Sequence, residues 1–230
     1  MTGLALICSL GLVHSVFAFT WTEDGDAGEL PVGDPFVTAQ SVTGDGPLDE
    51  IRGSLTLQPR GDTLGPDVDM YRIFLSGGQT FSATTVGGSI LDTQLFLFDS
   101  DGFGVYGNDD ASGVVQSTLP NGSITSLSPV APGDYFLAIS HFNTDPVSVG
   151  GLIFPSSPFG DVHGPTGPGG ASPISGWILA NEGFSSGDYR IFITGGTGTD
   201  VPIPEPATLL LLGSGVAGVA WATRNRQRRK

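Results

Sequence analysis

The chain has 230 residues and a formal net charge of −14, and 39% of its residues are hydrophobic. Its 36 glycines and 17 prolines introduce frequent turns, which favours many short strands over long helices. Residues 19–199 carry 21 acids against four arginines, a charge of −17, which repels phosphate backbones and argues against a nucleic-acid partner.

The chain begins with an apolar run over residues 4–17 that ends in a small-x-small pattern and is followed by acidic sequence. This pattern predicts a secretory signal peptide over residues 1–18, cleaved after Ala18, although no Lys or Arg precedes the run. The alternative is a buried N-terminal strand or helix. The only cysteine, Cys8, lies in this segment, so the mature chain is expected to contain no disulfide.

Residues 19–46 are acidic and rich in glycine, and we expect a loop region there. After it, apolar runs separated by turn dipeptides predict strands, and no stretch of the body has a sustained helical period. This pattern favours an all-β fold, a jelly-roll-like β-sandwich over residues 47–195. The expected strands are residues 51–57, 70–75, 81–86, 95–98, 114–118, 124–127, 135–139, 177–179 and 189–193.

Residues 67–140 carry a series of motifs that includes Asp67-Val68-Asp69-Met70-Tyr71 and Ala131-Pro132-Gly133-Asp134-Tyr135. In this order they resemble the bacterial pre-peptidase C-terminal (PPC) domain, a jelly-roll sandwich appended to many secreted proteins. A Pro/Gly-rich insertion at about residues 143–175 departs from the compact form of that domain, and we expect it to be a long exposed loop. Residues 188–194 are then the expected final strand.

Acidic residues gather in the turns of this region, where Ca²⁺ finds the hard oxygen ligands that it prefers. Some domains similar to this one bind calcium near their strand ends. Asp99-x-Asp101-Gly102 begins like a calcium loop but lacks the closing glutamate of an EF-hand. The alternative is that these side chains cap turns. The candidate calcium ligands are Asp67, Asp69, Asp99, Asp101, Asn108, Asp109 and Asp110, with Asp92 nearby.

No catalytic constellation is evident, and we expect the protein not to be an enzyme. Paired carboxylates can hydrolyse glycosides, but aspartate-rich turns supply such pairs too easily to indicate that activity. His141 and His163 are the only histidines of the body, and there is no nucleophile elbow and no zinc motif. Aromatic residues of predicted loops either stack on sugar rings or cover the core: Phe103, Tyr106, Phe142, Phe154 and Phe159.

The C-terminal part of the chain has three sections. Residues 196–206 form a tether that contains Pro204-Glu205-Pro206, whose prolines keep it extended. Residues 207–223 are uncharged and close to the minimum length of a transmembrane helix. A basic tail follows, and the positive-inside rule places it in the cytoplasm and the acidic body outside. Its basic residues are Arg224, Arg226, Arg228, Arg229 and Lys230.

This arrangement over residues 202–230 resembles the PEP-CTERM sorting signal. The resemblance implies cleavage near Pro204-Glu205-Pro206 by an exosortase, in a Gram-negative bacterium that makes extracellular polysaccharide. The alternative is an ordinary C-terminal anchor. We therefore expect an exported structural or adhesive protein of the cell surface or extracellular matrix. A carbohydrate- or protein-binding module, stabilised by calcium, is the second hypothesis, and a hydrolase is the third.

Overall fold

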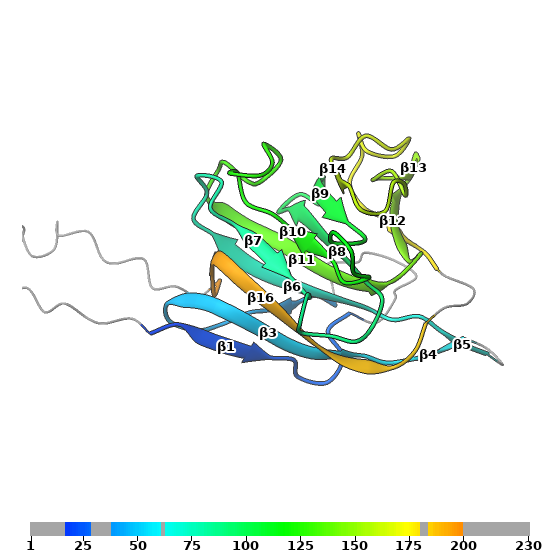
Figure 1. Cartoon of the computed structure of the whole chain (residues 1–230), viewed down its shortest axis with the longest axis horizontal. Helices are drawn as coiled ribbons and strands as arrows, with labels where there is room; N and C mark the ends of the chain where they lie inside the picture. The colour runs from blue at the N-terminus through cyan, green and yellow to red at the C-terminus, as the bar shows by residue number, and fades with distance from the viewer. Residues whose placement is uncertain (1–16, 29–37, 61–62, 180–183, 200–230) are drawn as a thin grey trace, which may run out of the picture. The chain divides into compact units, whose positions relative to one another are not determined.

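The computed structural model describes residues 17–28, 38–60, 63–179 and 184–199 of the chain. These residues form strands and turns and contain no helix, which confirms the all-β prediction (Figure 1). None of their segments is a helix long and apolar enough to cross a membrane. Residues 1–16 of the expected signal peptide lie outside the described residues, as do Pro204-Glu205-Pro206, residues 207–223 and the basic tail.

Eleven strands form one continuous sheet that folds into two layers. In the first layer the order is β1 (Phe19–Thr22), β3 (Pro47–Leu55), β16 (Gly187–Thr197), β7 (Ser82–Thr84) and β10 (Thr118–Leu119). β1 pairs with β3 in parallel, and the other neighbours in this layer are antiparallel.

The second layer is built around β6 (Val68–Leu75), β11 (Gly133–His141), β8 (Thr93–Asp99) and β9 (Gly104–Asn108), which are antiparallel neighbours in this order. β14 (Val162–His163) extends it beside β9, and β2 (Gln40–Ser41) pairs with β6 in parallel. A separate hairpin joins β4 (Gln58–Arg60) to β5 (Thr63–Gly65).

β16 connects the two layers because its register shifts between Phe192 and Gly196. Before the shift it pairs with β3, and after it Gly196 and Thr197 also pair with β6. Gly195 lies in this bulge with a φ of 76°, a backbone conformation that residues with a Cβ rarely adopt. The long strand therefore lies in both layers and closes them around one core.

The main core lies between the layers and takes alternate residues from each strand. β6 directs Tyr71, Ile73 and Leu75 inward, as expected from the period of two in a strand. On β11 and β8, the residues that alternate with the inward-facing ones are also buried, but on the opposite face of the second layer. Those outward residues include Phe96, Phe98, Phe136 and Ala138, so this layer is covered on both faces.

The insertion covers that outer face, which corrects the expectation of a long exposed loop. It forms a three-stranded sheet in the order β13 (Gly151–Leu152), β12 (Asp145–Ser148) and β15 (Gly176–Ile178). Ile153, Phe154 and Ile174 of the insertion are buried in a second core against Phe96 and Phe98. These apolar residues lie among prolines and glycines without the alternation of a strand, so the sequence pattern does not predict that they are buried.

Most expected strands exist, but the expectations for three segments were wrong. Residues 19–22 are β1 and not part of a loop, because Phe19 and Trp21 pack against the main core. Residues 114–118 contribute only Thr118 to β10, since Val114 and Val115 are exposed in a turn. Residues 124–127 form turns, and no strand lies there. The final strand β16 contains the expected residues 188–194 and extends past them at both ends. Gly196 and Thr197, expected to begin the tether, belong to this strand because they pair with β3 and β6.

The two ends of the sandwich differ. At one end β6 and β8 begin while β9 and β11 finish, because these strands alternate in direction. At the other end the chain enters at Phe19, which pairs with Leu48, and leaves at Thr199, whose N–H donates to the Val42 carbonyl at 2.8 Å. Figure 1 shows both described termini on the left of the domain.

Candidate functional site

Three carboxylates converge where β6 begins, and we call this group the β6 acidic cluster: Glu23, Asp26 and Asp69. One oxygen of each lies within 4.8 Å of the others. The backbone brings them together because the chain after β1 crosses from β3 to β6. The Glu23 N–H donates to the Arg52 carbonyl at 2.8 Å, and the Met70 N–H donates to the Ala27 carbonyl at 2.8 Å.

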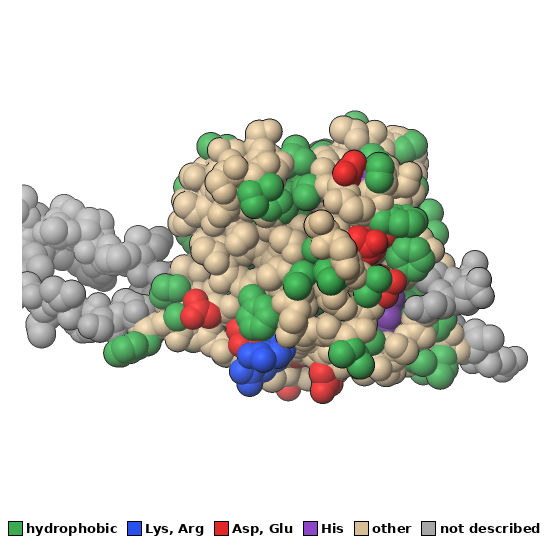
Figure 2. Space-filling view, in the orientation of Figure 1, with side chains coloured by type: hydrophobic (Ala, Val, Ile, Leu, Met, Phe, Trp, Pro, Cys, Tyr) green, Lys and Arg blue, Asp and Glu red, His purple; other side chains and the backbone are tan. Residues whose placement is uncertain are grey.

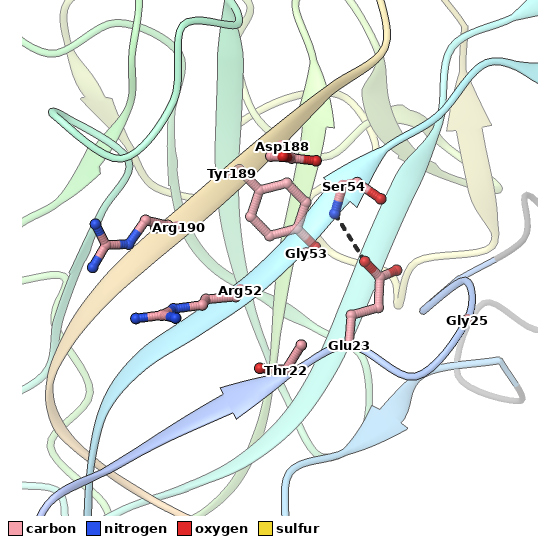
Figure 3. Close-up of a pocket in the computed structure, with 9 residues that line it drawn as sticks. All are labelled: Thr22, Glu23, Gly25, Arg52, Gly53, Ser54, Asp188, Tyr189 and Arg190. Atoms are coloured by element: carbon pink, nitrogen blue, oxygen red, sulfur yellow. Dashed lines mark hydrogen bonds between the residues drawn. The ribbon is translucent and has the colours of Figure 1, made fainter.

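Glu23 is oriented by backbone donors on both oxygens. Its Oε1 accepts from the Ala27 N–H at 2.9 Å, and its Oε2 accepts from the Ser54 N–H at 2.8 Å (Figure 3). Gly53 makes this possible, because a Cβ there would lie 2.6 Å from Glu23 Oε2 and 2.3 Å from the Tyr189 hydroxyl. A glycine is needed at this point to let both side chains approach the strand.

Asp69 has no exposed surface, and its two oxygens differ. Oδ2 accepts from the Tyr189 hydroxyl at 2.7 Å, and Tyr189 is in turn hydrogen-bonded to the Tyr71 hydroxyl. Oδ1 is buried and has no hydrogen-bond partner among the described residues. A buried carboxylate oxygen without a donor is costly unless it binds a proton or a cation.

The pKa values in this cluster shift as that burial requires. Burial, and then the charges of Asp67 and Glu23, raise the pKa of Asp69 well above its ordinary range. The pKa of Glu23 is also raised, mainly by burial, against the opposing effect of its two backbone donors. The β6 acidic cluster therefore binds protons readily in the absence of a metal, and its oxygen ligands fit Ca²⁺.

Asp67 lies beside this cluster but is satisfied by donors. Its Oδ2 accepts from the Thr56 N–H at 2.7 Å, and its Oδ1 accepts from the Val68 N–H at 2.9 Å. Gln58 Nε2 donates to the same Oδ1 at 3.2 Å. Burial still raises the pKa of Asp67. Its hydrogen bonds fix the chain ahead of β6, so Asp67 positions the cluster.

The other predicted ligands lie elsewhere. Asp99 Oδ1 accepts from the N–H groups of Asp101 at 3.0 Å and Phe103 at 2.9 Å, within the turn between β8 and β9. This is the turn-capping arrangement, at the opposite end of β8 from the β6 acidic cluster. Asp109 and Asp110 follow β9 and form a second acidic group with Asp92. Asn108 Nδ2 donates to the Asp110 carbonyl at 3.0 Å.

Sequence reasoning missed Glu23 and Asp26 as candidate ligands because both fell in a region expected to be a loop. The available signal was the acidic run Glu23-Asp24-Gly25-Asp26, which directly follows the apolar residues of β1. This acidic run lies near β6 because β1 pairs in parallel with β3. Parallel strands are distant in sequence, so no local pattern predicts which strand β1 pairs with.

An open hollow lies next to Glu23 and is lined by both signs of charge (Figure 3). Arg52 and Arg190 point to one side of it, and Glu23 lies on the other. Both arginines are engaged by Glu50 on β3: Arg190 Nη2 donates to Oε2 at 2.9 Å, and Arg52 Nε donates to Oε1 at 2.6 Å. The hydrogen bonds from Arg190 and then Arg52 lower the pKa of Glu50 to about 2.

His141 holds a buried position at the end of β11. Its Nε2 donates to the Ser185 carbonyl at 2.9 Å, and its Nδ1 accepts from the Asp67 N–H at 3.3 Å. Of the aromatic residues considered for sugar stacking, Tyr106 and Phe154 belong to the two cores. Phe103 and Phe159 are about two-fifths exposed, and Phe159 packs edge-on against Phe142 at 5.4 Å.

Two segments of the chain match known families. Residues 67–141 match the bacterial pre-peptidase C-terminal domain, and residues 202–227 match the PEP-CTERM protein-sorting motif. The chain carries a PPC domain and a sorting motif. These matches confirm both resemblances, and the motif implies export and cell-surface sorting in a Gram-negative bacterium. No curated protein and no solved structure matches the chain.

The PPC match covers the strands from β6 to β11 and ends at His141, directly before the insertion. β3 and β16, which lie outside the match, complete the first layer. Asp69 and the Asp92–Asp109–Asp110 group lie inside the match, whereas Glu23 and Asp26 precede it. The candidate metal site at β6 is therefore shared between the PPC domain and the N-terminal segment of this chain.

Proposed function

We propose that this is an exported structural or adhesive protein of the cell surface or extracellular matrix, and not an enzyme. The observation that carries the proposal is the order of a PPC domain and a PEP-CTERM motif at residues 202–227. An exosortase would cleave near Pro204-Glu205-Pro206 and release the domain from residues 207–223, which would anchor it as a transmembrane helix until then.

The fold of the described residues supports this topology. β1 begins at Phe19, directly after the proposed cleavage of the signal peptide at Ala18, so the mature chain would begin with an ordered strand. Two strand layers around a shared core are what a jelly-roll-like sandwich requires. The chain reaches Thr199 at the end of the domain opposite the β6 acidic cluster.

A structural role also agrees with the way the domain is stabilised. Two buried clusters hold the layers and the insertion together in a chain whose only cysteine lies within the proposed signal peptide. Such a domain relies on packing outside the cell, where disulfides are common in other small proteins. Calcium at the β6 acidic cluster would add to this packing, and the buried Asp69 Oδ1 without a donor supports that addition.

The experiment that tests the proposal replaces Pro204, Glu205 and Pro206 with alanine in the native bacterium. We expect the wild-type protein at the cell surface and in the medium, and the triple variant in the membrane fraction. Pro202→Ala is the matched control because it changes a proline of the same segment outside Pro204-Glu205-Pro206. Equal distribution of wild type and triple variant would contradict exosortase sorting.

The second candidate function is a carbohydrate- or protein-binding module stabilised by calcium, with extracellular polysaccharide as the partner. The exposed Phe103 and Phe159 favour it, because aromatic faces can stack on sugar rings. Binding of the exported protein to the polysaccharide of its own cells, lost in Phe103→Ala or Phe159→Ala, would support this function. Surface localisation without such binding would leave the structural role.

A further inference from the structure

A second group of carboxylates lies where β8 begins and β9 ends, and we call it the β9 acidic cluster: Asp92, Asp109 and Asp110. One oxygen of each lies within 4.8 Å of the others. The antiparallel pairing of Leu95 with Asn108 brings these chain ends together. Three strand spacings separate β6 from β9, so the two acidic clusters are roughly 14 Å apart.

Two oxygens of this cluster are buried and receive no hydrogen bond from the part of the chain that the structure describes. Asp109 is only 8% exposed, and its Oδ1 has no partner among the described residues. Asp92 Oδ1 is likewise buried and unpartnered. Native proteins leave few buried polar atoms in this state, and a carboxylate oxygen without a donor calls for a ligand.

The charges of the cluster have no counterion within the described part of the chain. The ion pairs found there join Glu50 to Arg52 and Arg190, and Asp134 to Arg72. A fourth carboxylate, Asp145 on β12, adds to the repulsion. Burial, followed by the charges of Asp110, Asp92 and Asp145, raises the pKa of Asp109 to about 8.

The backbone around the cluster is held in place by many hydrogen bonds. The Asp110 N–H donates to the Phe159 carbonyl at 3.0 Å, and the Phe142 N–H donates to the Asp92 carbonyl at 3.1 Å. Asn108 Nδ2 bonds the Asp110 and Asp161 carbonyls at 3.0 and 3.1 Å. The backbone that carries the carboxylates is thus held in place before any ligand arrives, which lowers the cost of binding.

The cluster borders a surface hollow at Asp110, whereas Asp109 lines a tighter pocket beside Phe159. Asp110 is half-buried and lines a surface hollow together with Ala111, Ser112 and Asp161. An ion can therefore reach the cluster at Asp110, where water can supply further ligands. Oxygens bound to one Ca²⁺ at 2.3–2.6 Å lie at most about 5.2 Å apart, so the observed spacing accommodates one ion.

We propose that Asp92, Asp109 and Asp110 bind one Ca²⁺ ion, at a site separate from the β6 acidic cluster. Three carboxylates and water provide the hard oxygen ligands that Ca²⁺ prefers, and no nitrogen or sulfur ligand is included. The bound ion joins the start of β8 to the end of β9. It stabilises the end of the sandwich that lies away from the described termini.

The test is calorimetric titration of Ca²⁺ into the full-length chain, purified in detergent and freed of metal with a chelator. We expect Asp109→Asn and Asp92→Asn each to weaken one binding event about tenfold or more, because Ca²⁺ affinity follows the number of charged ligands. Asp101→Asn is the matched control, since Asp101 is exposed in the turn at the other end of β8. Wild-type binding in Asp109→Asn would overturn the proposal.

Thermal unfolding of the same proteins at pH 8.5 separates metal binding from a purely structural role. Without metal, Asp109→Asn should melt above wild type, because it removes an uncompensated buried charge. With millimolar Ca²⁺ the order should reverse. An Asp109→Asn protein that melts below wild type by the same margin in both conditions would overturn the proposal. Neither measurement depends on surface sorting, so failure here leaves the proposed function untouched.

Discussion

Asp69 and Asp109 are buried acids, and each leaves one carboxylate oxygen without a donor from the described residues. Asp69 lies at the start of β6 and Asp109 directly after the end of β9, at the same end of the sandwich. Each has two acidic neighbours with oxygens within 4.8 Å. Since no described arginine is paired with either cluster, protons and cations compete for the same oxygens. The stability of the domain should therefore depend on both pH and divalent cations.

The pH dependence without metal follows from Asp109. Its pKa is about 8 in the folded protein against an ordinary 3.8, so folding favours the protonated acid. The stabilisation is present below about pH 4 and is lost as the pH rises towards 8. In chelator, the melting temperature of wild type should fall more between pH 5 and pH 8 than that of Asp109→Asn. Parallel curves for the two proteins would contradict the raised pKa.

The hydroxyl of Tyr189 bridges Asp69 and Tyr71, and removing it leaves two buried groups without a partner. Tyr189→Phe should therefore lower the free energy of unfolding by about 1–3 kcal/mol. Tyr71→Phe is the matched control because Tyr189 can still donate to Asp69, and its cost should be about 1 kcal/mol or less. Thermal unfolding followed by circular dichroism compares them, and equal losses would contradict the bridging role.

The residue types of the candidate sites could be predicted from the sequence, but their grouping could not. Acids in glycine-rich turns indicated oxygen ligands, and Asp69, Asp109 and Asp110 do lie in clusters. Asp99 and Asp101 look identical to them in sequence and cap a turn. The difference comes from long-range pairing of strands, which determines the end of the sandwich at which each turn lies.

At the scale of elements, strands with strong apolar periodicity were predictable. Residues 95–98 are apolar without alternation, which is typical of a strand buried on both faces, and β8 is covered by both cores. β9 and β12 escaped prediction because glycine, proline and polar residues interrupt their short apolar pattern. Their strand conformation depends on neighbours that are distant in sequence.

The insertion is predicted to contribute to stability and not merely to extend from the domain. Phe154 is 4% exposed and stacks on Phe96 at 5.4 Å between ring centroids. Phe154→Ala should lower the free energy of unfolding by about 3–5 kcal/mol, since it opens a cavity in the second core. Val149→Ala, at a side chain that is 90% exposed, should change it by about 0.5 kcal/mol or less. Equal effects of the two substitutions would show that the insertion is not packed as described.

At the scale of the whole molecule, acidic side chains occur in several separate places on the face shown in Figure 2, whereas basic side chains form one group. The acidic clusters lie at the end of the sandwich away from Phe19 and Thr199. If the domain is tethered through either described terminus, both acidic clusters therefore lie at the end of the sandwich away from the point of attachment. This arrangement suits a surface protein whose stability responds to the divalent cations of its surroundings.

The most direct test of the central claim is the intact mass of the mature protein recovered from the cell surface and the medium. We expect a chain that begins at Phe19 and ends near Pro206, without residues 207–230. That mass would result from removal of the signal peptide and cleavage at the sorting motif. A mass that still includes Lys230 in the surface protein would contradict sorting by cleavage and leave residues 207–223 as a permanent anchor.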